Sequence, residues 1–343
     1  MDTRIKKKIL AFYDSDSTYT ERLSRYLGKR SDCIFDVRGF SDQKAFDDFV
    51  RRTPIEVLLV SKEAMTQELD TQSDMVFMLA EDSGEQDESH ETVYKYQSSD
   101  LLIREVMAAY EARKLSCTDG EGKMKAEVIG VYSPVGRCYK TTFSLVLGML
   151  LSERAPSIYL SFEDYPGISS MLHEAGDTAE EKAGDDLSDI LYYRRVSKEE
   201  KGRLFHAVRC SGKLSYIPPV SCPADIRSAK PEELASIAAS LGGSELYRYL
   251  ILDVGNAIAD PIPLFSLCSR IFVPGRRDKV SESKIAAFQE YLGSIGQEDI
   301  LRRLEYVSVP TYAQMEEGVD MVSAKLSPLG RYMEKHMGEL GFA

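Results

Sequence analysis

One short succession restricts the fold of this 343-residue chain more than any other feature. An apolar strand pattern from Glu127 to Tyr132 runs into the loop Ser133 to Lys140, and a helical pattern from Thr141 to about Glu153 follows at once. A strand joined by a tight loop to a helix is the first half of a strand–helix–strand crossover, the unit of parallel sheets with helices on their faces. We therefore expect an α/β domain around this segment.

The remainder of the chain's second half continues the same alternation of strand and helix patterns. We expect further strands at Ser157–Ser161, Leu214–Ile217, Tyr249–Asp253, Arg270–Val273 and Tyr306–Val309, and helices at 232–241, 281–292 and 329–337. Repeated alternation of this kind is typical of a doubly wound parallel sheet. Residues 126–343 are predicted to form this domain.

The first 113 residues predict a second doubly wound parallel sheet, of the flavodoxin type. Expected strands are Ile9–Tyr13, Cys33–Val37, Ile55–Val60, Met75–Ala80 and Val93–Tyr94, with helices at Tyr19–Leu27, around Phe46–Val50 and at Leu101–Arg113. Ile55–Val60 is apolar throughout, as expected of a strand covered on both faces. Residues 114–125 (KLSCTDGEGKMK) lose all periodicity, so we expect a linker there between domains 1–113 and 126–343.

Composition narrows the classes of function. The formal net charge is −12, and such a field repels nucleic-acid phosphates, so nucleic-acid binding is not expected. The six cysteines and four histidines are scattered without metal-ligand spacing, which gives no support for a metal site built from them. The sequence shows neither a signal peptide nor an apolar run near the roughly 20 residues of a spanning helix. We expect a cytoplasmic protein.

The loop before Thr141 has features of a nucleotide phosphate loop. Lys140 stands one residue before the predicted helix, placed to reach β- and γ-phosphates, and Thr141 would offer its hydroxyl to Mg²⁺. The amides of the helix N-terminus add donors for phosphate. Candidate nucleotide-binding residues are Gly136, Arg137, Cys138, Tyr139, Lys140, Thr141 and Thr142.

The loop departs from the pattern GxxxxGK[ST] at both of its glycines. Pro134 and Tyr139 occupy those positions, and Gly136 is the one glycine left in the loop. Glycine matters there because the backbone must curl around phosphate without obstruction by side chains. Two interpretations stay open: retained nucleotide binding, or a Lys-Thr pair at a helix start in a fold that has lost its ligand.

Carboxylates follow two of the predicted strands. Asp253 ends an apolar strand, the Walker B arrangement that holds Mg²⁺ through water, so Thr141 and Asp253 are the candidate metal residues. Glu163 and Asp164 follow the strand Ser157–Ser161, where a water-positioning carboxylate is found in nucleotide hydrolases, and Glu163 and Asp253 are the candidate catalytic residues. A solvated loop before Pro166 is the alternative interpretation of the Glu163–Asp164 pair.

The N-terminal domain resembles a response-regulator receiver. Asp14 and Asp16 follow the first strand, where receivers place magnesium-binding carboxylates, and Lys95 follows the fifth, where receivers have a lysine that contacts phosphate. Strand three ends at Ser61, not at the aspartate that accepts phosphate, and strand four ends Ala80-Glu81 without the receiver hydroxyl residue. We expect a receiver-like docking module without phosphorylation, in which Asp14 and Asp16 are loop and helix-capping residues.

The second domain resembles the ParA/MinD superfamily of deviant Walker ATPases in its order of strand, Lys-Thr loop, acidic loop and Asp253 strand. A degenerate receiver ahead of it is similar to the CpaE/TadZ-type proteins, which localise Tad/Flp pilus assembly at the cell pole. The resemblance implies ATP and Mg²⁺ as cofactors, a homodimer, and protein partners in an assembly or secretion machine. It implies a position in the cytoplasm, at the inner face of the membrane or at a cell pole.

Two residues depart from the superfamily's pattern. Val135 stands where its members have a second lysine that reaches across a dimer. Arg137 is a candidate replacement for that cation, but a solvent-facing side chain or an intramolecular ion pair is the favoured interpretation of Arg137. Ser161 matches the first carboxylate of the switch loop, so hydrolysis is expected to be slow or absent.

The last predicted helix carries Leu329, Met333, Met337 and Leu340 on one face, opposite mixed charges. That face is expected to pack on the domain, since the basic excess that favours lipid is missing, and any membrane contact to be indirect. The sequence as a whole favours an ATP-binding localisation scaffold. A nucleotide-free interaction protein is the alternative, and a transcriptional regulator is disfavoured because no helix-turn-helix pattern is present.

Overall fold

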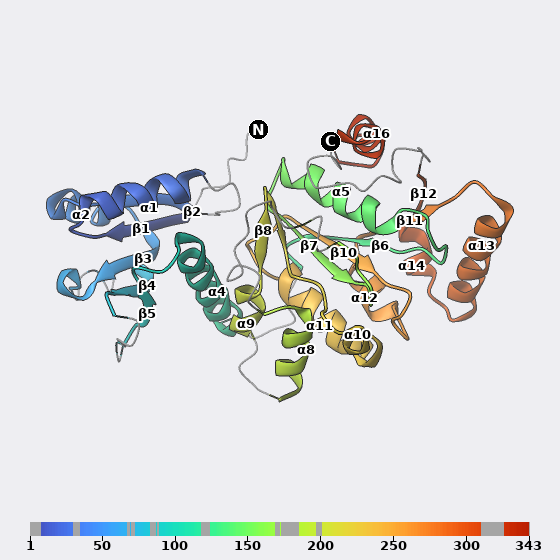
Figure 1. Ribbon diagram of the computed structural model, residues 1–343, viewed down its shortest axis with the longest axis horizontal. Helices are drawn as coiled ribbons and strands as arrows, with labels where there is room; N and C mark the ends of the chain where they lie inside the picture. The colour runs from blue at the N-terminus through green and yellow to red at the C-terminus, as the bar shows by residue number, and fades with distance from the viewer. Residues whose placement is uncertain are drawn as a thin grey trace. The chain divides into compact units, whose positions relative to one another are not determined.

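The chain folds into two compact units, Met1–Cys117 and Thr118–Ala343, each with its own sheet and core (Figure 1). The computed structural model describes residues 8–29, 35–66, 69, 73–82, 87, 89–117, 124–168, 172, 185–196, 201–309 and 326–342. Both units are α/β with parallel sheets, the fold class that the sequence predicts.

The first unit has a five-stranded sheet in the order β2-β1-β3-β4-β5. Its strands are β1 (Lys8–Tyr13), β2 (Phe35–Phe40), β3 (Ile55–Ser61), β4 (Ser73–Ala80) and β5 (Glu91–Tyr94), and every pairing between neighbours is parallel. This order is the flavodoxin type of doubly wound sheet. The carboxyl ends of β1 and β5 carry Asp14 and Lys95, which come together at one edge of the sheet.

Helices cover both faces of the first sheet. Helices α1 (Ser17–Lys29) and α4 (Ser99–Cys117) pack on Leu10 and Phe12 of β1, whereas α2 (Gln43–Val50) packs on the opposite face with Ala11. Alternate residues of a strand point to opposite faces, so one apolar strand supplies both cores. β3 likewise contributes to both, which confirms the expectation for Ile55–Val60.

Two predicted boundaries in this unit are wrong. Helix α4 continues to Cys117, so the first four residues of the expected linker are helical. Strand β2 is Phe35–Phe40 and therefore ends three residues later than predicted, because its pairing with β1 continues to Tyr13. Cys33, the predicted start of β2, lies outside the described residues.

The second unit has a seven-stranded sheet in the order β12-β11-β6-β10-β7-β9-β8. Its strands are β6 (Glu127–Val131), β7 (Ser157–Phe162), β8 (Arg209–Ser211), β9 (Leu214–Tyr216), β10 (Tyr249–Val254), β11 (Arg270–Gly275) and β12 (Leu304–Ser308). The pairings are parallel except for the hairpin β8–β9 at one edge, which the sequence did not predict. In register, Asp253 of β10 lies between Val131 of β6 and Ser161 of β7.

Helix α5 (Lys140–Ser152) lies at the centre of the second core. Its first residue is Lys140, one earlier than predicted, and all but its early threonines and last serine are buried. In this unit α5 and α16 (Pro328–His336) lie on one side of the sheet and α11 (Pro231–Gly242) and α12 (Ile262–Leu267) on the other (Figure 1). The remaining helices are α8 (Leu187–Val196), α9 (Lys201–His206), α10 (Pro223–Ser228), α13 (Lys279–Ser294) and α14 (Glu298–Arg303).

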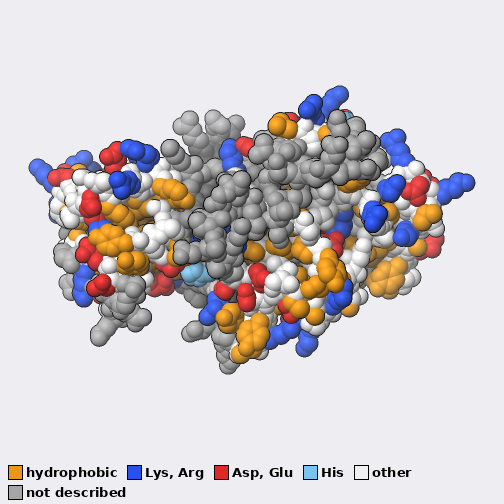
Figure 2. All heavy atoms as spheres, in the orientation of Figure 1, with side chains coloured by type: hydrophobic (Ala, Val, Ile, Leu, Met, Phe, Trp, Pro, Cys, Tyr) orange, Lys and Arg blue, Asp and Glu red, His pale blue; other side chains and the backbone are white. Residues whose placement is uncertain are grey.

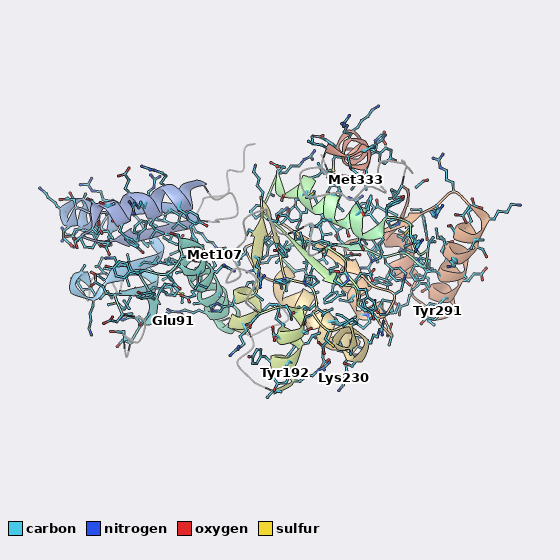
Figure 3. The ribbon with its side chains drawn as sticks, viewed as in Figure 1. Glu91, Met107, Tyr192, Lys230, Tyr291 and Met333 are labelled. Carbon is cyan, nitrogen blue, oxygen red and sulfur yellow. The ribbon has the colours of Figure 1, made fainter. Side chains whose placement is uncertain are left out.

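The apolar face of α16 packs against the domain, as predicted. Leu329, Met333 and Met337 are buried in the same cluster as the apolar residues of α5, and Leu340 is half-buried against it. Figure 3 labels Met333 on the side of α16 that faces α5. In the described part of the chain, no helix combines the length and apolar character that crossing a membrane requires.

Candidate functional site

The loop after β6 is anchored to the neighbouring strand β11. The hydroxyl of Ser133, fully buried, donates to the carbonyl oxygen of Pro274 at 2.6 Å and accepts from the amide of Val135 at 3.1 Å. The thiol of Cys138 donates to the carbonyl oxygen of Val135 at 3.1 Å, which closes the loop on itself. These contacts fix the path of the chain between the strand and α5.

Two residues of this loop have left-handed backbones. Arg137 has φ 55° and Tyr139 has φ 63°, and they are the only non-glycine residues with positive φ in the described ranges. A side chain disfavours this conformation by about 1–2 kcal/mol, which is why glycine usually takes it. The ring of Tyr139 packs against the core around α5 and offsets part of that cost. The chain therefore keeps a curled path at a position where the phosphate-loop pattern has glycine.

The Lys140 ammonium lies between two carboxylates. Its Nζ is 2.6 Å from Glu163 Oε1 and also contacts Asp253 Oδ1, and its side chain is only 9% exposed. Burial opposes the charge on Lys140, but the charges of Asp253 and Glu163 outweigh burial and raise its pKa above the usual range. Lys140 is therefore a charged, internally paired lysine at the N-terminus of α5.

Asp253 is fully buried, with both of its carboxylate oxygens engaged. The hydroxyl of Tyr159 donates to Oδ2 at 2.9 Å, while Lys140 contacts Oδ1. Burial, together with the neighbouring Asp253 charge, raises the pKa of Tyr159 well above its ordinary value, so the phenol stays protonated as a donor. Tyr159 was not among the residues singled out from the sequence because it reads as an ordinary apolar strand residue.

The acidic pair after β7 divides between two partners. Glu163 turns to Lys140, whereas the Asp164 carboxylate accepts from Arg227 Nε at 2.9 Å and Nη2 at 2.5 Å. Gly255, just beyond β10, lets the backbone at Phe162 and Glu163 pass close to the end of β10. A Cβ at Gly255 would stand 2.4 Å from the Phe162 carbonyl oxygen. Only Glu163 of the pair therefore belongs to the site around Lys140.

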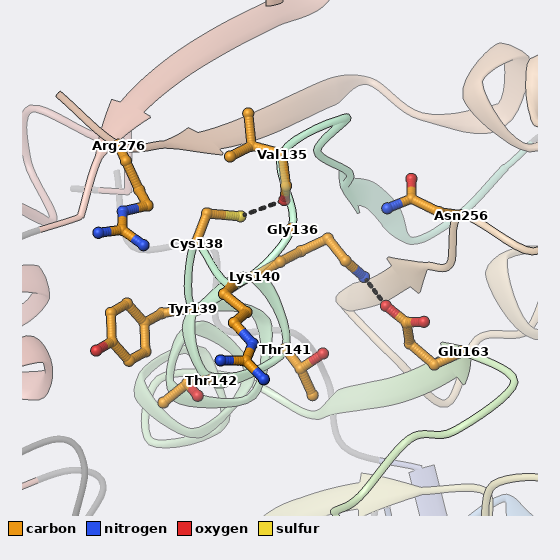
Figure 4. A pocket seen from close by; sticks show the side chains of 11 residues that line it. Val135, Gly136, Cys138, Tyr139, Lys140, Thr141, Thr142, Glu163, Asn256 and Arg276 are labelled. Carbon is orange, nitrogen blue, oxygen red and sulfur yellow. Dashed lines mark hydrogen bonds and ion pairs between the residues drawn. The ribbon is translucent and has the colours of Figure 1, made fainter. Parts of the chain in front are cut away.

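A pocket of about 670 Å³ opens over this loop (Figure 4). It is lined by Val135, Gly136, Arg137, Cys138, Tyr139, Lys140, Thr141, Thr142, Glu163, Asn256 and Arg276. The structure thus brings all seven predicted loop residues together with Glu163, while Asp253 lies beneath Lys140. Asn256 and Arg276 were missed by the sequence reasoning. Their only signal is that each follows shortly after a strand, β10 or β11, that flanks β6.

The residues that line this pocket suit an Mg²⁺ ion that is bound together with a polyphosphate. They suit less well an Mg²⁺ ion that is held by protein ligands alone. Thr141 lines the pocket and offers a hydroxyl oxygen, while Asp253 can accept from metal-bound water once Lys140 turns to a phosphate. Within the described residues, no group of three or more His, Cys, Asp or Glu side chains is arranged to hold a metal ion. Bound Mg²⁺ would neutralise phosphate charge at this end of the pocket.

The first unit also holds a buried lysine at the carboxyl end of its sheet. Lys95 Nζ lies 2.7 Å from Asp14 Oδ2, with the two side chains 7% and 3% exposed, and 3.5 Å from Glu81 Oε1. Burial opposes the Lys95 charge, but the hydrogen bond and charge of Asp14 raise its pKa. Asp16 caps α1 by accepting from the amides of Thr18 and Tyr19, and Asp14 Oδ1 accepts from the Asp16 amide at 2.8 Å in the loop before the helix, as predicted. The other oxygen of Asp14 makes the ion pair with Lys95, which was not predicted.

No known family profile matches the sequence, and no curated protein matches it. Among solved structures, the second unit resembles a candidate plasmid partition protein from Borrelia burgdorferi B31 bound to AMPPNP (TM-score 0.47, 15% identity, covering 64% of this chain and 100% of that one). A ParA family ATPase from Chlorobium tepidum TLS gives a TM-score of 0.45 at 17% identity, over 64% and 100%. The MinC:MinD cell division complex of Aquifex aeolicus gives a TM-score of 0.40 at 16% identity, and the match covers 55% of this chain and 71% of that one.

These solved structures are ParA/MinD-type proteins, and the likeness runs over about two thirds of this chain. Each TM-score is below 0.5 and each identity below 25%, so they establish neither family nor function for this chain.

Proposed function

We propose that the second unit binds ATP in the pocket over Ser133–Thr142. The observation that carries the proposal is a charged lysine, Lys140, at the N-terminus of a buried helix, on the wall of a pocket of about 670 Å³. The amides that begin α5 and the ammonium of Lys140 are donors for phosphate oxygens, and Thr141 and Thr142 add hydroxyls. The size of the pocket suits a nucleotide, because ligand pockets commonly measure about 300–1,000 Å³.

Binding requires Lys140 to exchange partners. In this structure its ammonium pairs with Glu163 and Asp253, and in the bound state it would donate to phosphate instead. Asp253 keeps the Tyr159 hydroxyl as a hydrogen-bond donor after the exchange, and the charge that would replace Lys140 beside it is that of Mg²⁺. Thr141 and Asp253 are the residues proposed to hold Mg²⁺, Asp253 through water.

Hydrolysis is proposed to be slow or absent. Among the described residues of the loop after β7, Glu163 is the one carboxylate that lines the pocket, and it is the candidate to orient an attacking water. Ser161, fully buried in the strand, stands where the ParA/MinD superfamily has a further carboxylate, and a neutral hydroxyl is a poor substitute for it. At most a weak ATPase is therefore expected.

The role proposed for the whole chain is that of an ATP-dependent localisation or assembly scaffold, of the CpaE/TadZ type for Tad/Flp pilus machinery. ATP would favour a homodimer of the second unit, which shifts the population toward a form that presents the first unit to partners. Lys and Arg side chains lie interspersed with Asp and Glu side chains among the described residues on the face shown in Figure 2. Cytoplasmic residence, with indirect contact to membrane or pole, belongs to the same proposal.

The test is ATP affinity with Mg²⁺, measured by calorimetry on the wild type and on Lys140→Ala. The wild type is expected to bind saturably below millimolar ATP, and the variant roughly a hundredfold more weakly, because a charged hydrogen bond to phosphate is lost. Equal affinities would remove Lys140 from the site. Sedimentation with and without ATP tests the dimer, and an unchanged mass would contradict it.

The alternative is an interaction protein that binds no nucleotide. The pairing of Lys140 with two carboxylates favours it, since an ammonium so satisfied gains less from phosphate than a free one does. The same calorimetry separates the two functions: no saturable binding by the wild type up to millimolar ATP would establish the alternative.

A further inference from the structure

We infer that Arg276 supplies a further phosphate-binding cation of the pocket from within the same chain, in place of the loop lysine that is absent at Val135. The inference rests on the proposed ATP binding and names how this chain would complete that site. It differs from a cation contributed across a dimer, because Arg276 and Lys140 line one pocket of one molecule.

The charges around Lys140 make a second cation necessary. Glu163 and Asp253 together carry two negative charges against the single positive charge of Lys140, so this end of the pocket is net negative before any ligand binds. A triphosphate brings several more negative charges into the same space. Helix amides, one shared lysine and the exposed Arg137 of the loop leave that charge only partly compensated, and a further cation that lines the same pocket reduces the repulsion.

The fold carries Arg276 to the pocket. It follows Gly275, the last residue of β11, and β11 pairs with β6 directly beside the loop. Ser133 ties the loop to the same strand end through the Pro274 carbonyl. In Figure 4 the Arg276 side chain lies across the loop from Glu163, so it stands at the opposite side of the pocket from the carboxylate that engages Lys140.

Arg276 is also available to a ligand. Its side chain is 53% exposed, and the ion pair that it makes among the described residues, with Asp278, is long at 3.9 Å. Asp278 is itself occupied as the N-cap of α13, where it accepts from the Ser281 amide at 2.9 Å and from the Ser281 hydroxyl at 2.8 Å. A guanidinium with so loose a partner can turn to phosphate at little cost, and its planar fork matches phosphate oxygens.

The next residue provides a matched control. Arg277 donates from Nε to the Ser308 hydroxyl at 3.0 Å, toward β12, and it is not among the described residues that line the pocket. Arg276→Ala and Arg277→Ala therefore remove the same charge from adjacent positions on the exposed end of one strand. Only the first is expected to affect ligand binding.

The experiment compares ATP, ADP, AMP and adenosine by calorimetry on the full chain with Mg²⁺, using the wild type, Arg276→Ala, Arg276→Lys and Arg277→Ala. Arg276→Ala should weaken ATP binding roughly tenfold or more, which is the range for a hydrogen bond between charged groups. The same variant should weaken ADP binding less and should leave adenosine binding unchanged. Arg276→Lys should recover part of the loss, and Arg277→Ala should match the wild type. Measurements below the concentration at which ATP changes the sedimenting mass confine the effect to one chain.

Each contrary outcome has a distinct meaning. If Arg276→Ala binds ATP as well as Arg277→Ala does, while the wild type binds it, the inference is overturned and the proposed function stands. An equal loss for ATP and adenosine places Arg276 at the base and also overturns the inference. If the wild type binds no ATP, both the proposed function and the inference are overturned.

Discussion

Each unit of this protein buries one lysine at the carboxyl end of a parallel sheet, yet the two lysines stand in different surroundings. Lys95 pairs with the buried Asp14 and lies 3.5 Å from the exposed carboxylate of Glu81, and the rings of Tyr19 and Tyr96 lie 5.1 and 5.3 Å from its Nζ. Lys140 pairs with two carboxylates on the wall of a large pocket. The first lysine is enclosed by side chains of its own unit, and the second faces space for a ligand.

The comparison separates a structural use of a buried lysine from a functional one. A lysine that pairs with one buried carboxylate and one exposed carboxylate, and that is flanked by aromatic rings, stabilises the strand ends that it joins. A lysine beside helix amides and hydroxyls can exchange its partners for phosphate. Substitutions at the two lysines and their partners test whether Lys95 is needed for folding alone and whether Lys140 can exchange its carboxylate partners for phosphate.

The largest effect is expected from breaking the closed pair in the first unit. Lys95→Met leaves the Asp14 carboxylate buried without its partner, which should cost about 3 kcal/mol of stability in that unit. Native-state hydrogen exchange of the full chain, read at the β1 and β3 amides, measures the loss. Exposed Lys44→Met is the control. Adding Asp14→Leu to Lys95→Met should restore part of the stability, because the buried carboxylate is then removed as well. If Lys95→Met and Lys44→Met are equally stable, the Lys95–Asp14 pair does not support the fold.

A smaller effect of opposite sign is expected at Lys140. Glu163→Gln removes one of the two charges that compete with phosphate for the ammonium, so ATP should bind roughly fivefold more tightly while any turnover falls. Asp164→Asn, whose carboxylate contacts Arg227 away from the pocket, should change ATP affinity little. Calorimetry gives the affinity and phosphate release gives the turnover. Weaker binding by Glu163→Gln would indicate that Glu163 positions Lys140 and does not compete with the ligand.

The smallest effect concerns alkaline stability of the first unit. Burial, then the Asp14 charge, raise the pKa of Tyr19 to about 12 from 10.0. Because the pKa of Tyr19 is higher in the folded state than in the unfolded state, its contribution to the free energy of unfolding is complete below pH 10. That contribution is lost as pH rises toward 12. Tyr19→Phe should therefore flatten this loss in denaturation curves between pH 9 and about 12. It should cost little at neutral pH, since the Tyr19 hydroxyl has no hydrogen-bond partner among the described residues. An unchanged alkaline limb would remove Tyr19 as its source.

Much of the fold follows from apolar periodicity, because parallel strands buried on both faces leave long apolar runs. β3 and β10 are examples, and both were located to within one residue. The hairpin strand β8 was missed because it has only three residues, one of them a half-buried arginine. The extension of α4 to Cys117 was missed because helix ends depend on local capping more than on periodicity.

The site was predictable where its residues are consecutive. Lys140 and the loop before it could be identified because strand, loop and helix follow one another in the chain. Arg276 and Asn256 lie more than a hundred residues away, and only the order β11-β6-β10 brings them to the loop. The left-handed backbone at Tyr139 could not be predicted either, since tyrosine has no preference for it and the surrounding packing imposes it.

The central claim is that the second unit has an open ligand site and the first a closed one. Hydrogen exchange of the full chain, with and without saturating ATP and Mg²⁺, tests both parts in one experiment. The account predicts slower exchange at amides 133–142 with ATP and no change at amides 13–20 and 94–96. Unchanged exchange at 133–142, or equal protection in the two units, would contradict it.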